Sequence, residues 1–388
     1  MIKLYPSTSH IWGKTGGCTA NPMMTAILAK QEPGDDAKDG LAAHELAYKI
    51  NCEQARSPMF KPTRESVVGT MTSVGVMITD EMYDAVEVFT NDVQNHMVSS
   101  RVFGGDHLGF ETSLPIHSIS KFCNGKIDAY LYDHVKNQLI IWDYKHGKTP
   151  VEAFEFAQGI IYANGLIDKF KINGLLDQKT VVIIKIIQPN AYKKESAIDE
   201  WRIRASDLRG YFNIFRHNAH KAIHSPTTTT GSHCKRCPAR HTCEAALKAG
   251  MEYYEVSTQP TPLNMSDEDL ALQYSIVSRG VEMLKALQSG YQEQIEIKLR
   301  QGKSIPGYGL EPSFSRLKWS KPYHEIKKLG EFLKKKLTKD ALITPNQAID
   351  LGLDEEVVKQ YSSKTKTGVK LVKQDTSNAR RIFTQCST

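Results

Sequence analysis

Two short segments of the sequence carry the residues best suited to metal-dependent chemistry. Asp143 and Lys145 stand two residues apart in LIIWDYKHGK, and Asp128 lies fifteen residues upstream of Asp143 in GKIDAYLYD. Both segments set β-favouring residues beside the polar ones, and the second nearly alternates. The sequence therefore predicts two strands joined as a hairpin, with the three charged residues near its open end.

The register of this hairpin decides whether the two carboxylates meet. If residues 134–137 form the turn, counting back along both strands places Asp128 opposite Asp143. Their Cβ atoms would then lie about 4.5–5.5 Å apart, and Lys145 would share their face because side chains repeat every second residue. Two carboxylates at that separation raise each other's pKa unless a cation lies between them.

A divalent metal is the natural cation for such a pair. An all-oxygen site suits Mg²⁺ or Mn²⁺, and the backbone carbonyl of Tyr144 is placed to add a ligand. The ion would lower the pKa of bound water and neutralise a phosphate oxygen, while Lys145 orients the nucleophile or stabilises the transition state. On spacing alone an ion-paired patch on a solvated sheet face is an equally good interpretation, since Asp-x-Lys is common.

Further motifs occur in the order found in RecB-type nucleases of the PD-(D/E)xK superfamily, which the chain resembles. GLAAHELAYK, with Gly40 and His44, is similar to the family's G-x-x-x-H helix, and FAQGIIYANG, with Gln158 and Tyr162, is similar to its Q-x-x-x-Y helix. Glu111 in FETSLPI lies where relatives often carry a glutamate on the strand before the hairpin. Taken alone, the Gln-Tyr pair and the histidine are more often packing residues than functional ones.

The resemblance implies a fold and a site. The fold is α/β: a restriction-endonuclease-like core with a central mixed sheet between helices, helical additions and a small α-rich C-terminal region. Ile127 replaces the proline of the superfamily's name, a tolerated variant. The implied metal ligands are His44, Asp128, Asp143 and the Tyr144 carbonyl, and the implied catalytic residues are Glu111, Asp128, Asp143, Lys145, Gln158 and Tyr162.

Three cysteines form a cluster with metal-ligand spacing. Cys234, Cys237 and Cys243 stand in HCKRCPARHTC, and thiols gathered this closely indicate a soft metal centre. Iron-sulfur members of the RecB and AddB type add one N-terminal cysteine, so the resemblance implies Cys18 as fourth ligand of a [4Fe-4S] cluster. Structural zinc is the alternative, with His233 or His241 alongside. Cys52, Cys123 and Cys386 are interpreted as ordinary thiols.

The chain divides into a nuclease domain over residues 1–250 and a helical, basic region over residues 262–388. It has 388 residues and a formal charge of +7. The segment 316–339 carries nine Lys or Arg against two Glu, so it could follow a phosphate backbone or be a solvated helix face. Predicted elements are helices at 75–100, 151–166 and 207–222, a sheet from 108 to 145, a strand at 180–189 and a long helix from Ser266 to about Gln301.

The expected function is a metal-dependent DNA nuclease, more specifically an exonuclease acting on ends or single strands. The alternative is a non-catalytic DNA-binding or assembly protein on a nuclease-like scaffold. The stretch 302–308 also resembles an uncharacterised phage and prophage family, which implies DNA replication or recombination and a protein partner from those processes. With no secretory signal and no long apolar run, we expect no membrane association and a reducing cytoplasm, that of the host for a phage protein. The long helix could also pair with a second copy of the chain.

Overall fold

The structure is a computed structural model of the chain. It describes residues 2–28, 33–57, 62–172, 179–192, 196–257, 264–314, 318–319, 321, 323–335, 337, 343–364 and 366–373. The chain forms two compact units, Met1–Tyr291 and Gln292–Thr388. Each unit is described by itself below.

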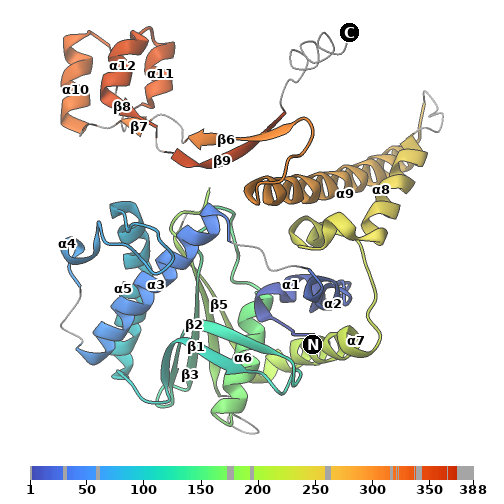
Figure 1. The fold of residues 1–388 in the computed structure, drawn as a ribbon. Helices are drawn as coiled ribbons and strands as arrows, with labels where there is room; N and C mark the ends of the chain where they lie inside the picture. The colour runs from blue at the N-terminus through green and yellow to red at the C-terminus, as the bar shows by residue number, and fades with distance from the viewer. Residues whose placement is uncertain are drawn as a thin grey trace. The chain divides into compact units, whose positions relative to one another are not determined.

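A five-stranded mixed sheet is the centre of the first unit (Figure 1). The strands follow one another in the order β1-β2-β3-β4-β5, and all neighbours are antiparallel except the parallel pair β3–β4. Helix α6 provides the crossover that a parallel pair needs. The bounds are β1 (Leu108–Pro115), β2 (Asn124–Asp133), β3 (Gln138–Tyr144), β4 (Val181–Ile187), β5 (Ile198–Arg204) and α6 (Ala157–Lys169).

The β2–β3 hairpin has the register that the sequence predicts. Asp133 pairs with Gln138 around the turn, and Ala129 pairs with Trp142 further along. The next position in this register places Asp128 opposite Asp143. The mixed sheet flanked by helices, expected from the order of the motifs, is also present.

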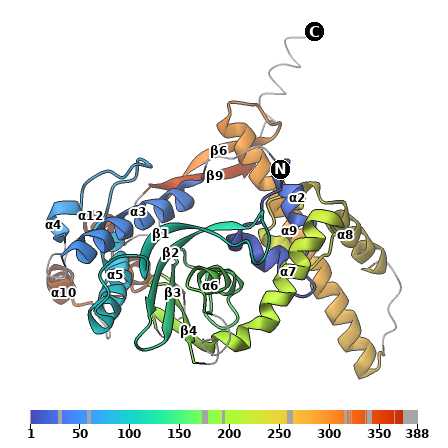
Figure 2. The ribbon, with the colours of Figure 1, turned by 90° about the horizontal axis from the view of Figure 1, so that it is seen from below.

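Helices cover both faces of the sheet (Figure 2). Helices α3 (Asp35–Arg56) and α5 (Asp80–Ser100) pack on one face, where Ile140 and Trp142 of β3 join their buried cluster. Helix α6 and helix α7 (Arg209–His224) pack on the other face, with Leu139 and Ile141. The strict alternation along β3 is the period-2 pattern of a strand buried on both sides.

The helix after Pro150 begins later than the sequence predicts. We expected residues 151–166 to be helical, whereas α6 spans Ala157–Lys169. The backbone N–H groups of Val151 and Ala153 donate to side chains from the β4–β5 side of the sheet, and these bonds replace the first helical turns. The acceptors are Gln188 Oε1 at 2.9 Å and Asp199 Oδ2 at 3.0 Å.

The cysteine segment lies between short helices at the end of the first unit. Its elements are η1 (Pro6–Thr8), α1 (Ser9–Trp12), α2 (Asn21–Ala26), η3 (Ser232–Arg236), η4 (Arg240–Thr242) and α8 (Glu244–Ser257), followed by α9 (Asp267–Arg300). Elsewhere in the unit, α4 (Arg64–Val67) lies between α3 and α5 in the sequence, and η2 (Ala205–Leu208) lies between β5 and α7. Ser266 caps α9 as predicted, because its Oγ accepts from the Asp269 N–H at 3.1 Å. Within the first unit, Met283 and Ala286 of α9 pack against Cys234.

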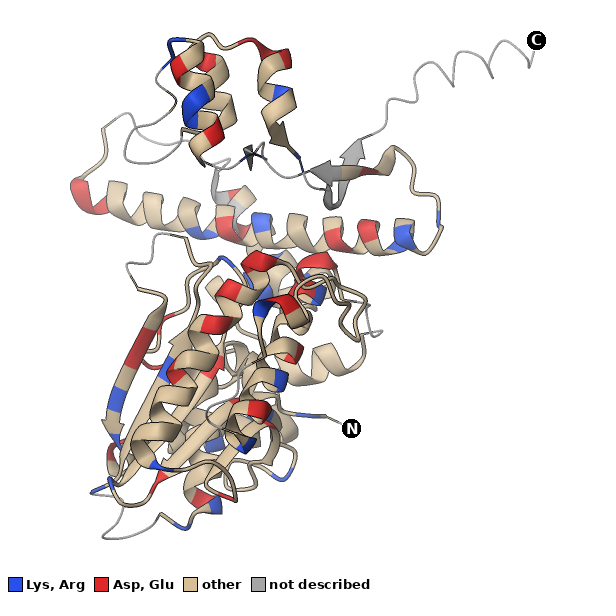
Figure 3. Cartoon of the chain, turned by 90° about the vertical axis from the view of Figure 1, so that its left-hand side faces the viewer, with Lys and Arg blue, Asp and Glu red and all other residues tan. Residues whose placement is uncertain are grey.

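The second unit combines helices with small sheets. Strand β6 (Tyr308–Phe314) pairs with β9 (Lys366–Lys373), and β7 (Lys318–Trp319) pairs with β8 (Ser362–Ser363). Helices α10 (Tyr323–Phe332), α11 (Pro345–Asp350) and α12 (Glu355–Tyr361) accompany a small core that includes Ile326, Leu337, Ala348, Leu353 and Val358. Of the nine Lys or Arg residues of the basic segment 316–339, Arg316, Lys336 and Lys339 lie outside the described residues. In α10, Lys327 and Lys328 alternate with Glu325 and Glu331, and acidic and basic residues are interspersed elsewhere too (Figure 3).

None of the helices in the described ranges combines the length and the apolar character of a bilayer-crossing segment.

Candidate active site

Three side chains from α3, β1 and β2 converge on a group that could hold a metal ion. His44 Nδ1 lies 3.0 Å from Glu111 Oε1 and 3.6 Å from Asp128 Oδ1. One ligand atom from each residue lies within 4.8 Å of the others. All three line a pocket of about 670 Å³, together with Tyr48 and Lys126.

Glu111 reaches this group through an unusual backbone conformation. Its φ is 46°, in the middle of β1, while its neighbours Phe110 and Thr112 pair normally with β2. A left-handed conformation at a residue other than glycine costs about 1–3 kcal/mol and is typical of functional sites. The Glu111 Oε2 atom also pairs with Lys126 Nζ at 2.6 Å.

His44 and Asp128 strongly influence each other's protonation. Burial disfavours the charged imidazole of His44, but the charges of Asp128 and Glu111 outweigh burial and raise its pKa to about 9. Burial raises the pKa of Asp128 to about 7; the charge of His44 opposes this shift and the charge of Asp143 adds to it. Asp128 Oδ2 accepts the backbone N–H of Tyr144 at 2.8 Å, which holds the carboxylate at the open end of the hairpin.

Asp143 is a buried carboxylate that lacks normal hydrogen bonds. Its side chain is 1 % exposed, and its Oδ2 lies 2.7 Å from Lys145 Nζ. That contact is an ion pair, and apart from Lys145 neither oxygen has a hydrogen-bond donor within the described chain. Asp143 stands outside the group of three within 4.8 Å, but its charge raises the pKa values of both Asp128 and His44.

Lys145, Gln158 and Tyr162 form a chain of contacts from β3 to α6. Lys145 Nζ donates to Gln158 Oε1 at 3.5 Å, and Gln158 Nε2 donates to the Tyr162 hydroxyl at 3.3 Å. That hydroxyl donates to the Lys126 backbone carbonyl at 2.7 Å, and burial raises the pKa of Tyr162. Gln158 therefore faces Lys145, whereas Tyr162 is buried behind it and holds it in place.

These side chains fit Mg²⁺ or Mn²⁺. Two carboxylates offer hard oxygen ligands and the imidazole adds a borderline nitrogen at the same point. The oxygens of Asp143 are buried without a hydrogen-bond donor other than Lys145, and a cation would satisfy them. The sequence analysis names Glu111 as a catalytic residue but not as a metal ligand. In the structure its carboxylate lies with His44 and Asp128 in the group that could hold a metal ion. The backbone N–H of Tyr144 donates a hydrogen bond to Asp128. Metal coordination by the backbone carbonyl of Tyr144 stays a prediction.

The four cysteines of the predicted cluster occupy one region of the first unit. Cys18 and Cys237 share a buried apolar cluster, and Asn21 Nδ2 donates to Cys237 Sγ at 3.3 Å. Burial raises the pKa values of Cys18, Cys234 and Cys237. The charge of Cys243 raises the pKa of Cys18, and those of Cys18 and Cys234 raise the pKa of Cys237. All four thiols are thus within electrostatic reach, as a shared metal centre requires.

The sulfur spacing bears on which metal would fit. Four thiolates around one tetrahedral zinc lie about 3.8 Å apart, from a Zn–S distance of about 2.3 Å. Within the described residues, no three of the four cysteine sulfurs all lie within 4.8 Å of one another. His233 Nε2 contacts the Thr229 backbone carbonyl at 3.0 Å. Cys123 is buried in the core beside the sheet, and Cys386 lies outside the described residues.

Sequence reasoning missed several residues near the site. Lys126, two residues before Asp128, projects from the same strand to the same pocket, and period-2 counting would have found it. Lys14 and Arg236 line a second pocket beside Lys145. No sequence pattern links Lys14 with Arg236, because these two residues lie near opposite ends of the first unit and only the fold brings them together.

The comparisons with known proteins bear on the family. The model of a family described as "Protein of unknown function (DUF2800)" matches residues 2–376. No curated protein matches the chain significantly. Because the match spans nearly all of the sequence, the chain belongs to the DUF2800 family.

Proposed function

We propose that this protein is a metal-dependent DNA nuclease of the RecB-type PD-(D/E)xK kind. The observation that carries the proposal is the grouping of His44, Glu111 and Asp128 at a pocket, beside a buried Asp143–Lys145 pair. A buried carboxylate without hydrogen bonds is costly, and a protein retains one chiefly where a ligand compensates for it. A restriction-endonuclease-like core is the finer fold that this arrangement supports.

The chain's own residues have separate tasks in this function. His44, Glu111 and Asp128 would hold Mg²⁺ or Mn²⁺, with Asp143 close by. When bound, the ion supplies Lewis-acid polarisation of the phosphate and acidifies water. Lys145, held by Asp143 and Gln158, places an ammonium where negative charge develops on the phosphate in the transition state. Tyr162 keeps Gln158 directed at Lys145.

The cysteines would hold a structural [4Fe-4S] cluster. Cys18 precedes the nuclease motifs and Cys234, Cys237 and Cys243 follow them, so a shared centre would tie the two ends of the domain together. Burial raises the thiol pKa values of three of them, and a metal would convert these thiols to thiolates. Iron, sulfide and zinc analysis of anaerobically purified protein tests this: iron and sulfide support the cluster, and zinc alone contradicts it.

A nuclease assay tests the main proposal. Labelled single- and double-stranded DNA are incubated with Mg²⁺ or Mn²⁺ and wild type, Asp143→Ala or Lys145→Ala. Lys136→Ala is a matched control, because Lys136 pairs with Asp133 at 3.4 Å at the turn of the same hairpin. We expect degradation by wild type and the control only, with mononucleotide products if the enzyme is an exonuclease. Intact DNA with wild type under all conditions would favour the non-catalytic scaffold instead.

A further inference from the structure

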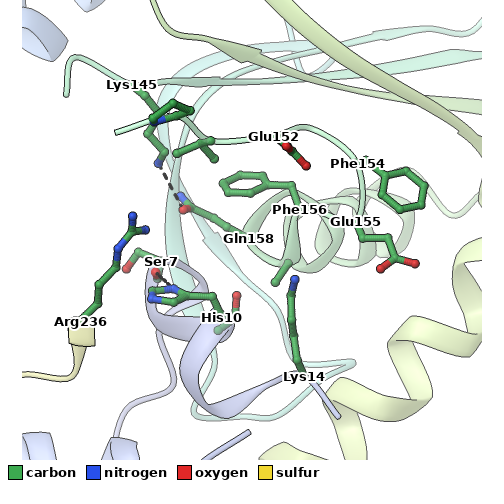
Figure 4. A pocket seen from close by; sticks show the side chains of 14 residues that line it. Ser7, His10, Lys14, Lys145, Glu152, Phe154, Glu155, Phe156, Gln158 and Arg236 are labelled. Carbon is green, nitrogen blue, oxygen red and sulfur yellow. Dashed lines mark hydrogen bonds between the residues drawn. The ribbon is translucent and has the colours of Figure 1, made fainter. Parts of the chain in front are cut away.

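A second pocket adjoins the candidate site on the side of Lys145. It has a volume of about 430 Å³, and Lys145 and Gln158 form part of its wall (Figure 4). The opposite wall comes from elsewhere in the sequence: Lys14 follows α1, and Arg236 ends η3. The pocket shares no lining residue with the one around His44, Glu111 and Asp128.

Two cations in this pocket have no counter-ion. The side chains of Lys14 and Arg236 form no ion pair or hydrogen bond with any residue that the structure describes. Both act on His10, which lies between them in the wall. Burial lowers the pKa of His10, the hydrogen bond to the Ser7 carbonyl opposes this, and the charges of Arg236 and Lys14 lower it further. Two cations without an ion-pair partner in one pocket favour an anionic ligand.

The pocket is asymmetric in charge. Glu152 and Glu155 also line it, but Figure 4 shows them with Phe154 on the side away from Arg236. The Tyr211 hydroxyl donates to Glu155 at 2.6 Å, so that carboxylate already has a partner. An anion entering the pocket is therefore directed to the end formed by Arg236, Lys145 and Gln158.

Aromatic rings complete the wall. Phe154 is 64 % exposed, and the Phe156 ring lies 5.5 Å from Lys145 Nζ. An exposed aromatic ring and unpaired cations in one pocket match the requirements of single-stranded nucleic acid, whose bases stack while its phosphates pair with Lys and Arg. A free phosphate would make no use of the exposed Phe154 ring, and the bases of a closed duplex are not available to stack on it.

We infer that this pocket holds the nucleotide next to the scissile phosphate of single-stranded DNA, with Arg236 on its backbone phosphate. The inference rests on the proposed nuclease function and assigns that function a strand-binding subsite. Lys145 in the wall of this pocket pairs with Asp143, whose charge also acts on Asp128 and His44 in the other pocket. Arg236 lies between Cys234 and Cys237, so the cysteine segment would supply a substrate-binding cation as well as a structural link.

Binding of a fluorescein-labelled oligo(dT) to the full chain, followed by anisotropy in EDTA, tests the subsite. We expect Arg236→Gln to weaken binding about tenfold and to lower the slope of log K against log salt by about 0.7. Lys235→Gln is the matched control, because Lys235 is adjacent, exposed and absent from the pocket wall. It should change Kd less than twofold, and Arg236→Lys should restore most of the binding.

The nuclease assay separates failure of the subsite from failure of the function. If wild type cleaves DNA, Arg236→Gln should raise KM and leave kcat nearly unchanged. Cleavage with equal Kd and KM for wild type and Arg236→Gln, or equal losses for Arg236→Gln and Lys235→Gln, overturns the subsite and leaves the nuclease intact. Binding that depends on Arg236 without any cleavage supports the subsite and rejects the nuclease. A wild type that neither binds nor cleaves overturns both.

Discussion

Two carboxylates on neighbouring elements of the same domain, Asp92 partly buried and Asp143 fully buried, have opposite surroundings. Asp92 of α5 receives Lys185 Nζ at 2.8 Å on one oxygen and 2.7 Å on the other, and it accepts the Trp142 indole N–H at 2.7 Å. Asp143 of β3 has a single ion-pair contact with Lys145 and no other hydrogen-bond donor within the described chain. One carboxylate is fully satisfied by the fold, and the other is not.

The difference separates a structural charge from a functional one. A satisfied buried pair holds α5 against the sheet, and removing either partner leaves the other charge without compensation. An unsatisfied carboxylate beside a pocket stabilises nothing by itself, but it can bind what enters. We therefore expect substitutions at Asp92 to change folding, and substitutions around Asp143 to change activity.

The largest expected effect is the loss of stability when the Asp92–Lys185 ion pair is broken. Asp92→Ala should lower the free energy of unfolding by about 3–5 kcal/mol, because Lys185 stays buried without its partner. Urea denaturation measures this, with Asp84→Ala as control: Asp84 is on the same helix but pairs at the surface with Arg64 and should cost less than about 1 kcal/mol. Equal losses at both positions would contradict the comparison.

The next effect is on catalysis at the unsatisfied site. Lys145→Ala should reduce kcat for DNA cleavage by about 10²–10³-fold, the range for removing one donor to a transition-state oxyanion. Because Asp143 then stays buried without its ion-pair partner, the melting temperature should also fall, so kcat is measured per folded protein. A variant that loses activity only in proportion to its loss of folded protein would make Lys145 a structural residue.

A metal titration sharpens the same distinction without measuring activity. Mn²⁺ at about one hundred times its Kd should stabilise the wild type by about 2.7 kcal/mol. Asp128→Asn should abolish this gain because it removes a ligand of the group of three, whereas Asp84→Ala should keep it. A Mn²⁺ response that survives in Asp128→Asn would place the ion elsewhere.

The smallest expected effect is a pH dependence of stability that arises from His96, beside the Asp92–Lys185 ion pair. His96 contacts Lys185 Nζ at 3.1 Å; burial lowers its pKa, the charge of Lys185 lowers it further, and Asp92 and Glu200 oppose this while Arg202 adds to it. Below the ordinary histidine pKa near 6.5, His96 is protonated in the unfolded chain but less so in the folded chain. Stability is therefore lost as the pH falls.

Urea denaturation between pH 8 and 5 in EDTA checks this expectation. The difference in unfolding free energy between wild type and His96→Gln should change in favour of the variant as the pH falls below about 6.5. A difference that is constant across this range would show that His96 titrates alike in the folded and unfolded chains.

Much of the scaffold followed from local sequence patterns. The β2–β3 register followed from a strand period of two and a four-residue turn, and the Ser266 cap followed from local hydrogen-bonding chemistry. The helix α5 was also legible, since its buried residues Met82 and Met97 recur at helical spacing. Each of these features depends on residues that are close together in the chain.

The sequence by itself determined which residues could do chemistry, because residue type and short-range spacing specify strands, turns and ligand classes. Only the tertiary structure decided the left-handed backbone that brings Glu111 to His44, the delayed start of α6, and the place of Arg236 beside Lys145. Those features arise from contacts between distant segments, where burial and long-range hydrogen bonds override local preference. The satisfaction of Asp92 and the isolation of Asp143 are likewise visible only once the chain has folded.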